Sequence, residues 1–447
     1  MASCTLDERP PQTQRRLNEG RTAQRQARDG DGRFEAGSGG AAMVAGNADH
    51  VNITARHERT GQLDRRHTGS TWCRAPTVVE SQRHSQSTHR LHSVGVVRNL
   101  QAVGDAHFLR AVGDVPTYAG STMGVPQTSP TFWRNRTVVV TGGHGFLGRH
   151  VVRVLTAAGA QVTAPRHAEH DLVRHGVAER LLAQVKPSHV IHLAARVGGI
   201  GYNQAEPAPL FLDNLQMGLN VIEAARAAGV EKTTILGTVC SYPKFTPVPF
   251  REASIWDGYP EETNAPYGIA KKALLVHTQV NRQQYGQRFA FVIPTNLFGP
   301  GDKFHESVSH VIPALIKKCV EAKEHGADKV HVWGTGAASR DYLYVSDAAR
   351  GIVLAAELHD DSEPLNLGNN REITIRETAE TIARVVGFEG DLVWDSAKPD
   401  GQPRRRVDAT RAENALGWHA STSFEDGIRD TVEWYLANRA VAEAAPH

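Results

Sequence analysis

The stretch that decides the fold is Val138-Val139-Val140-Thr141-Gly142-Gly143-His144-Gly145-Phe146-Leu147-Gly148. Its β-branched residues predict a buried strand, and the glycines after them predict a tight turn that opens a helix. Glycines let the backbone of such a turn approach a pyrophosphate, whose charge then lies on the free N–H groups of the helix N-terminus. A Gly-rich turn also serves as a plain strand-to-helix connection, but its place between an apolar strand and an amphipathic helix favours a dinucleotide site.

The sequence around this stretch alternates short β-branched runs with longer helical patterns. The strands are predicted at 137–141, 161–164, 189–193, 233–237 and 289–294, and helices at 146–158, 210–228 and 267–285. This rhythm is typical of a parallel sheet with helices on both faces. We therefore expect an α/β fold with a Rossmann-type doubly wound parallel sheet at 135–300, which binds the dinucleotide. Shorter elements and prolines after Gly299 predict a smaller C-terminal α/β lobe at 301–440, mainly for substrate binding.

Residues 1–130 differ sharply from the rest in composition. They are rich in Arg, His, Gln, Gly and Ser, and the first lysine of the chain is Lys186. Without a hydrophobic period they cannot offset a chain entropy of roughly 1–2 kcal/mol per residue, which predicts disorder. Two interpretations stay open: a misassigned N-terminal extension with Met123 as the true first residue, or a basic arm. Dispersed arginines without interleaved aromatics disfavour nucleic acid as the partner of such an arm.

The whole-chain composition excludes several other classes. The 447 residues carry a formal charge of +2, which gives no reason to expect nucleic acid or a membrane as a partner. The four cysteines are widely spaced and form no CxxC pair, so neither a disulfide framework nor a metal site is expected. No apolar run approaches the roughly 20 residues that span a bilayer. These features predict a cytoplasmic protein.

The end of the second predicted strand indicates the type of dinucleotide. An acidic residue there holds a ribose 2′-hydroxyl, whereas a basic residue accommodates a 2′-phosphate. The strand ends in Ala164-Pro165-Arg166-His167, with no acid. Arg166 and His167 therefore favour NADP(H) over NAD(H), unless both are simply solvated.

A second pattern suggests redox chemistry. Tyr267 and Lys271 stand four residues apart, one turn along a predicted helix. An ammonium beside a phenol favours the phenolate and brings its pKa toward a useful range for proton transfer. Thr238 ends a strand upstream and is a candidate to hydrogen-bond a substrate carbonyl. A Tyr-x-x-x-Lys pair alone most often lies on a solvent-exposed helix face and has no catalytic role. Here it follows the Gly-rich turn by roughly a hundred residues and stands at the start of a long predicted helix.

At this point the chain resembles the GDP-L-fucose synthase family of extended short-chain dehydrogenases/reductases, from about Arg136 to Asn438. The matching stretches are Ala194–Ile200, Cys240–Lys244, Pro294–Pro300, Ser309–Leu315 and Lys398–Arg404. The resemblance implies an NADPH-dependent enzyme that converts GDP-4-keto-6-deoxy-D-mannose to GDP-L-fucose by 3,5-epimerisation and 4-keto reduction, and a homodimer.

The resemblance also implies roles for individual residues. Cys240 and His310 are implied as the base and acid of the epimerisation, beside Thr238, Tyr267 and Lys271. The cofactor would be contacted, besides residues 142–148, Arg166 and His167, by Leu236, Gly237, Thr238, Lys271, Pro294, Thr295, Asn296, Leu297 and His310. The GDP-sugar would be held by Lys318, Trp333, Arg340 and Asp400. On composition alone, Cys240 is as readily a small buried hydrophobe, His310 a structural histidine, Lys318 a solvated residue and Trp333 a core residue.

Two other functions stay open from the sequence. One is an epimerase or reductase of another nucleotide-linked keto-sugar, because His144 and Thr238 stand where the family often has arginine and serine. The other is a non-catalytic, cofactor-bound regulatory or scaffold protein. The presence of Tyr267, Lys271, Cys240 and His310 together argues against this last function.

Overall fold

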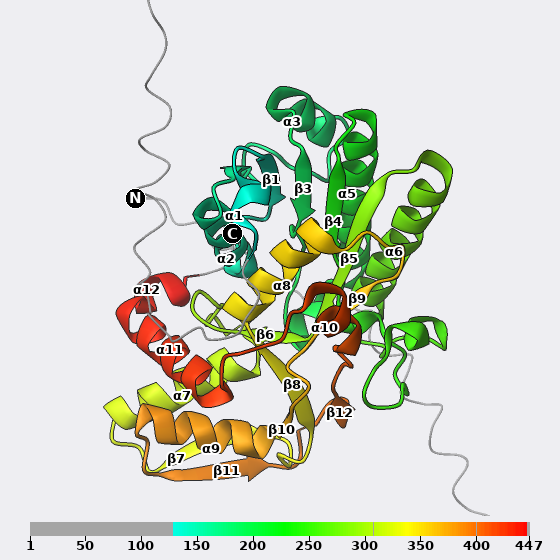
Figure 1. The fold of residues 1–447 in the computed structure, drawn as a ribbon. Coiled ribbons are helices and arrows are strands. Elements are labelled where there is room, and N and C mark those ends of the chain that lie inside the picture. Colours follow the sequence, from blue (N-terminus) through cyan, green and yellow to red (C-terminus); the bar gives the residue numbers. More distant parts are fainter. Residues whose placement is uncertain (1–127, 307, 399, 445–447) are drawn as a thin grey trace, which may run out of the picture. The chain divides into compact units, whose positions relative to one another are not determined.

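The structure is a computed structural model that describes residues 128–306, 308–398 and 400–444 (Figure 1). The expectations for residues 1–130 therefore fall outside the described residues, except for the last three. The described chain begins just before a short helix, α1 (Pro130–Trp133), whose Trp133 is fully buried.

A six-stranded parallel sheet in the order β2-β1-β3-β4-β5-β9 forms the larger part. Its strands are β1 (Thr137–Thr141), β2 (Gln161–Thr163), β3 (His189–His192), β4 (Lys232–Leu236), β5 (Arg288–Pro294) and β9 (Leu365–Leu367). The Rossmann-type sheet is thus confirmed, and β1 to β5 agree with the predicted ranges to within one residue at each end. The sixth strand, β9, comes from far along the chain and was not expected.

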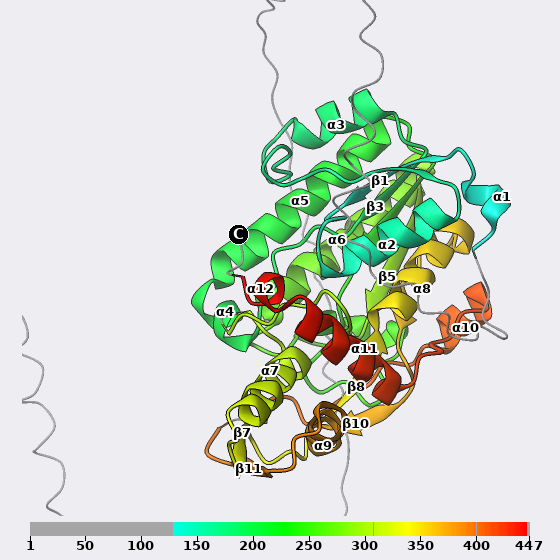
Figure 2. The same cartoon turned by 90° about the vertical axis from the view of Figure 1, so that its left-hand side faces the viewer.

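Helices cover both faces of this sheet (Figure 2). One face carries α2 (Phe146–Ala157), α8 (Val345–Leu358) and α10 (Thr410–Leu416), and the other carries α3 (Val177–Val185), α5 (Pro207–Ala227) and α6 (Ala265–Tyr285). Side chains alternate between the faces of a strand. Accordingly Val138 and Val140 pack with α2 and α8, whereas Val139 packs with α3 and α5. Burial on both sides explains why β1 is a continuous apolar run.

The smaller part is built around β8 (Ser339–Tyr344). This strand pairs with β6 (Asn296–Phe298), β10 (Glu372–Thr374) and β12 (Arg404–Arg405), while β7 (Lys329–Trp333) pairs with β11 (Asp391–Asp395). Its helices are α7 (Val311–Glu324), α9 (Ile375–Val386), α11 (Phe424–Ala437) and α12 (Arg439–Ala442). They enclose a separate core that includes Phe298, Phe304, Tyr342 and Tyr435. Because β9, α8 and α10 belong to the larger part, the chain after residue 300 contributes to both.

Local signals explain where several helices begin and end. Thr374 and Glu377 form a reciprocal capping box at the start of α9, and Ser423 caps α11. Gly286 adopts a left-handed conformation (φ 68°) that ends α6. The remaining short helices are α4 (Ile200–Ala205), η1 (Val239–Ser241) and η2 (Glu252–Trp256). Among the described residues, no helix has the length and apolar character to cross a bilayer.

Candidate active site

The Gly-rich turn after β1 leaves no room for a side chain at Gly142 or Gly148. A Cβ atom on Gly142, whose φ is +71°, would lie 2.7 Å from the backbone nitrogen of Ala194, and one on Gly148 would lie 2.0 Å from the carbonyl oxygen of Gly142. Gly145 is the N-cap of α2 and provides no side-chain cap. The first N–H groups of α2, from Phe146 and Leu147 onward, are therefore open to an anion, so the turn fits a dinucleotide pyrophosphate.

The tip of β2 lies against this turn. A Cβ atom on Gly143 would come within 2.7 Å of Ala164 Cβ, and His144 Nε2 hydrogen-bonds to the Ala164 carbonyl oxygen at 3.0 Å. Arg166 and His167, just beyond, are exposed, and neither pairs with a carboxylate in the described part of the chain. This basic tip fits a 2′-phosphate better than a bare ribose hydroxyl.

The other predicted cofactor residues follow neighbouring strands. Leu236 ends β4 and Gly237 follows it, where a Cβ atom on Gly237 would lie 2.4 Å from the Phe291 ring. The segment Pro294–Leu297 joins the end of β5 to β6, and there Asn296 Nδ2 and Thr295 Oγ1 donate hydrogen bonds to the Asp341 carbonyl oxygen. Because the strands are parallel, these ends and the Gly-rich turn share one edge of the sheet, where α/β proteins bind ligands.

Tyr267 and Lys271 lie near the start of α6 at the same edge. The Lys271 Nζ atom is 5.9 Å from the centroid of the Tyr267 ring. Burial lowers the pKa of Lys271 to about 8. Burial, together with the nearby Cys240, raises the pKa of Tyr267 above its usual range. This shift is opposite to the lowering expected from the lysine alone, because loss of water outweighs one ammonium at this distance. Tyr267 is therefore protonated at neutral pH.

Thr238 and Cys240 stand where β4 runs into η1. Thr238 Oγ1 accepts a hydrogen bond from the Cys240 backbone nitrogen at 3.2 Å, which caps this short helix and leaves the hydroxyl proton free to donate. A Cβ atom on Gly268 would lie 2.3 Å from the Cys240 carbonyl oxygen, so only glycine at 268 lets the first turn of α6 approach this closely. Ser241 Oγ also donates to the Gly268 carbonyl oxygen at 3.0 Å. These contacts hold Cys240 beside Tyr267.

An arginine that the sequence did not single out contacts the cysteine. Arg405 Nη1 of β12 donates to Cys240 Sγ at 3.9 Å. Cys240 is half-buried and its thiol is free. Arg405 is the middle residue of the run Arg404-Arg405-Arg406, and nothing in that run marks which arginine faces the site.

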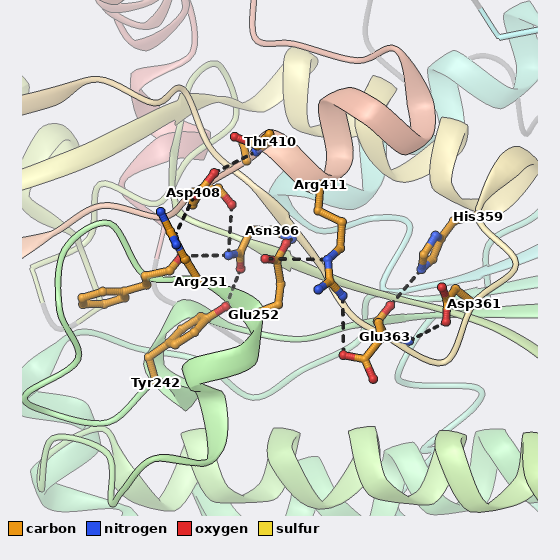
Figure 3. Close-up of polar contacts among 12 residues, drawn as sticks. Tyr242, Arg251, Glu252, His359, Asp361, Glu363, Asn366, Asp408, Thr410 and Arg411 are labelled. Carbon is orange, nitrogen blue, oxygen red and sulfur yellow. Dashed lines mark hydrogen bonds and ion pairs between the residues drawn. The ribbon is translucent and has the colours of Figure 1, made fainter.

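A polar network fastens the segment after Cys240 to the C-terminal part of the chain (Figure 3). Tyr242 OH donates to Asn366 Oδ1 at 2.7 Å, and Glu252 Oε1 accepts from the Asn366 backbone nitrogen at 2.9 Å. Asn366 Nδ2 donates in turn to the carbonyl oxygens of Phe250 and Asp408. Asn366 is fully buried, so this network is a fixed part of the site's frame.

His310 lies in the smaller part, at the start of α7. It is the N-cap of α7, and a Cβ atom on Gly199 would lie 3.3 Å from the carbonyl oxygen of the neighbouring Ser309. The His310 side chain keeps contact with solvent although protein atoms surround it, and this partial loss of water, with the charge of Lys303, lowers its pKa. Among the described residues, no hydrogen bond joins His310 to Cys240 or Tyr267.

The four predicted substrate residues lie in the smaller part. Lys318 is exposed and donates to the His331 carbonyl oxygen at 3.0 Å, and Trp333 is 64% exposed, which excludes a core role. Asp400 accepts hydrogen bonds from the nitrogen and hydroxyl of Thr335, which hold the pKa of this carboxyl below its usual range. Arg340 Nη1 donates to the carbonyl oxygens of Ser339 and Gln402, and burial lowers its pKa to about 10.

Comparisons with known proteins agree with this geometry. Residues 138–368 match the model of the NAD dependent epimerase/dehydratase family. The chain is 43% identical over 302 residues to GDP-L-fucose synthase 1 of Arabidopsis thaliana, covering 67% of this chain and 93% of that protein. It is 38% identical over 312 residues to GDP-L-fucose synthase of Escherichia coli strain K12, covering 68% and 97%.

A solved structure is similar as well. A GDP-L-fucose synthetase from Naegleria fowleri bound to NADP superposes with a TM-score of 0.63 at 29% identity, covering 70% of this chain and 97% of that one. The residues matched by the family model, 138–368, include the Gly-rich turn and the start of α6 with Tyr267 and Lys271. The chain therefore belongs to the NAD dependent epimerase/dehydratase family.

Proposed function

We propose that this protein converts GDP-4-keto-6-deoxy-D-mannose to GDP-L-fucose with NADPH, by 3,5-epimerisation followed by reduction of the 4-keto group. The observation that carries the proposal is that Cys240 shares its site with Tyr267 and Lys271, since a plain reductase has no use for a thiol there. The relatives named GDP-L-fucose synthase support the same substrate.

NADP(H) is the cofactor we propose, with the N-terminus of α2 at its pyrophosphate. Arg166 and His167 would bind the 2′-phosphate, and residues 142–148, 236–238 and 294–297, with Lys271 and His310, would line the rest. Bound NADPH supplies a hydride to C4 of the sugar. The NADP-bound relative from Naegleria fowleri supports this choice.

The reduction needs one proton for the C4 oxygen. Tyr267 carries that proton at neutral pH because its pKa is raised, and the Lys271 ammonium stabilises the phenolate left behind. Thr238 donates a hydrogen bond to the same oxygen from the end of β4. Both hydroxyls hold the carbonyl in place while charge develops on it.

The epimerisation uses the same carbonyl. The keto group acidifies the C–H bonds at C3 and C5 by delocalising the electron pair onto the C4 oxygen as an enolate, which Thr238 and Tyr267 stabilise. The Cys240 thiolate takes the proton and becomes a thiol, and the His310 imidazolium delivers a proton to the opposite face. The lowered pKa of His310 makes its imidazolium a readier donor, at the cost of a smaller protonated fraction.

The smaller part would bind the GDP moiety. Arg340 and Lys318 offer charge for the diphosphate and ribose region, and the exposed Trp333 offers an aromatic face to the base. Asp400 is fixed by Thr335 as a hydrogen-bond acceptor. In this division, residues 135–300 mainly bind cofactor and 301–440 mainly bind substrate.

A homodimer would form through α5 and α6. Leu212 of α5 and Val276 and Val280 of α6 are 57%, 43% and 46% exposed, and Val276 and Val280 lie one turn apart on α6. Light scattering should report a dimer for the wild type and a monomer for Val280→Asp.

We place the reaction in the cytoplasm, where a reducing environment keeps Cys240 a thiol.

The test supplies GDP-4-keto-6-deoxy-D-mannose and NADPH to the purified chain and identifies the nucleotide-sugar product. GDP-L-fucose is expected. Cys240→Ser should abolish deuterium incorporation from D₂O at C3 and C5 while NADPH binding is kept. NADPH binding without turnover of this sugar would contradict the proposed substrate, and unchanged incorporation in Cys240→Ser would contradict the role of the thiol.

A further inference from the structure

Arg405 carries a charge that no acidic side chain neutralises in the described residues. Its neighbours on β12 and beyond have other partners: Arg404 pairs with Glu372 at 2.6 Å, and Arg406 donates to the Asn370 carbonyl oxygen. Arg405 is half-buried, and its contacts are Gln402 and the Cys240 sulfur. Because no acidic side chain neutralises it, this guanidinium can stabilise an anion that forms beside it.

The position of the Arg405 guanidinium is fixed from two sides. Its backbone lies in β12, where Arg405 is in register with Arg340 of β8. Its Nε donates to Gln402 Oε1 at 3.0 Å, and Gln402 Nε2 donates to the Lys244 carbonyl oxygen at 3.0 Å. Nη1 is thereby directed at Cys240 Sγ, and the same glutamine links the guanidinium to the segment that follows Cys240.

The other ionisable groups near the sulfur make no hydrogen bond to it in the described residues. Tyr267 of α6 is protonated and neutral. Arg340 of β8 acts on the same region, but its Nη1 is already bonded to two carbonyl oxygens. Lys271 Nζ of α6 lies 5.9 Å from the Tyr267 ring centroid, and no hydrogen bond joins it to the sulfur in the described residues. Arg405 is the basic side chain that hydrogen-bonds to the sulfur in the described part of the chain.

We propose that Arg405 is a positioning residue for the epimerisation, whose guanidinium holds Cys240 as the thiolate that removes the substrate proton. This role rests on the proposed function. In the step, the C–H bond breaks, an S–H bond forms, and the electron pair moves to the C4 oxygen. Arg405 stays protonated throughout this step. Once Cys240 is a neutral thiol, the guanidinium no longer has an anion to stabilise.

The test measures alkylation of Cys240 by iodoacetamide between pH 6 and pH 10 in the full chain without substrate. Peptide mass spectrometry separates Cys240 from the other cysteines. Because thiolate is the reacting form, Arg405→Met should slow alkylation at pH 7 by about tenfold, and Arg405→Lys should restore most of the rate. Arg404→Met, one residue away on β12, is the matched control and should behave as the wild type.

A second readout connects the contact to catalysis. Deuterium incorporation into the keto-sugar should fall in Arg405→Met by a similar factor, with NADPH affinity unchanged. If that variant does not fold, Gln402→Ala removes the brace but keeps the charge, and should slow alkylation about two- to threefold. Equal alkylation profiles in the wild type and these variants overturn the inference. Absent deuterium incorporation in the wild type would instead overturn the proposed function, whatever the alkylation rates.

Discussion

Tyr242 OH donates a 2.7 Å hydrogen bond to Asn366 Oδ1, which joins the segment after the candidate base Cys240 to a residue 124 positions later in the sequence. Asn366 lies in β9, the last strand of the large sheet. The active-site segment is thus held by the strand that completes the sheet, and Glu252 and the Phe250 carbonyl oxygen bond to the same asparagine (Figure 3).

This network should contribute to both stability and activity. Asn366→Ala removes the partner of the Tyr242 hydroxyl and the side-chain donor to the Asp408 and Phe250 carbonyl oxygens, of which Phe250 keeps the bond from the Asp408 nitrogen. We expect the free energy of unfolding to fall by about 2–4 kcal/mol. Tyr242→Phe removes one hydrogen bond and should cost about 1 kcal/mol. Urea denaturation measures both. Tyr259→Phe, on the exposed part of the same segment, is the control and should change stability by less than about 0.5 kcal/mol. A cost as small for Asn366→Ala would mean that the network does not fasten the segment.

The buried ammonium of Lys271 should determine how reduction depends on pH. Its pKa is lowered to about 8, so the charge is present below that pH and is lost as pH rises through it. Tyr267, with its raised pKa, stays protonated over the same range. We therefore expect kcat/KM for NADPH oxidation, which reports groups of the free enzyme, to fall above about pH 8.

Lys271→Arg keeps a positive charge at this position. Burial does not make an arginine lose its proton near pH 8, because a guanidinium titrates only at much higher pH. In the pH profile of kcat/KM, the decrease above about pH 8 should move to higher pH in this variant, whatever its absolute rate. A decrease that stays near pH 8 in Lys271→Arg would show that another group controls it.

The Rossmann sheet was predictable because its information is local. The apolar run of β1, its glycines and the strand-helix alternation each concern neighbouring residues, and both faces of the sheet are buried, so the strands are continuous in hydrophobicity. β9 was missed because it has only three residues, Leu365–Leu367, and joins the sheet solely through pairing with β5. Neither its length nor its flanks distinguish it from a loop.

The candidate site likewise contains residues that the sequence predicts and residues that it does not. Tyr267 and Lys271 are linked by helical spacing, which the sequence reveals. Arg405 and Asn366 reach the site through strands paired far apart in the chain, which no spacing encodes. The direction of the Tyr267 pKa shift was also beyond the sequence, because it depends on burial and on Cys240 rather than on Lys271 alone.

The Gly-rich turn should tolerate a methyl group poorly where the cofactor approaches. Gly145 has φ −75°, which alanine adopts without strain, but its Cβ would lie 3.2 Å from the Gly142 carbonyl oxygen, at the open N-terminus of α2. We expect Gly145→Ala to weaken NADPH binding at least about tenfold, a cost of about 1.4 kcal/mol, with little change in unfolding. Fluorescence titration of NADPH measures the affinity. Gly201→Ala, where a Cβ meets no atom within 4 Å, is the matched control. Equal affinity in both variants would place the pyrophosphate elsewhere.

The exposed Arg166 should determine the preference of the enzyme for NADPH over NADH. A guanidinium donates charge-assisted hydrogen bonds to a 2′-phosphate but gains little from a ribose hydroxyl. Because Arg166 is solvent-exposed, the gain is moderate, and we expect Arg166→Ala to lower kcat/KM for NADPH about three- to tenfold while that for NADH changes little. Arg174→Ala provides the control, since Arg174 is an exposed arginine nearby whose charge is paired with Asp171. If Arg166→Ala lowered both cofactors equally, the residue would serve the adenosine as a whole, and the basic tip of β2 would not select the phosphate.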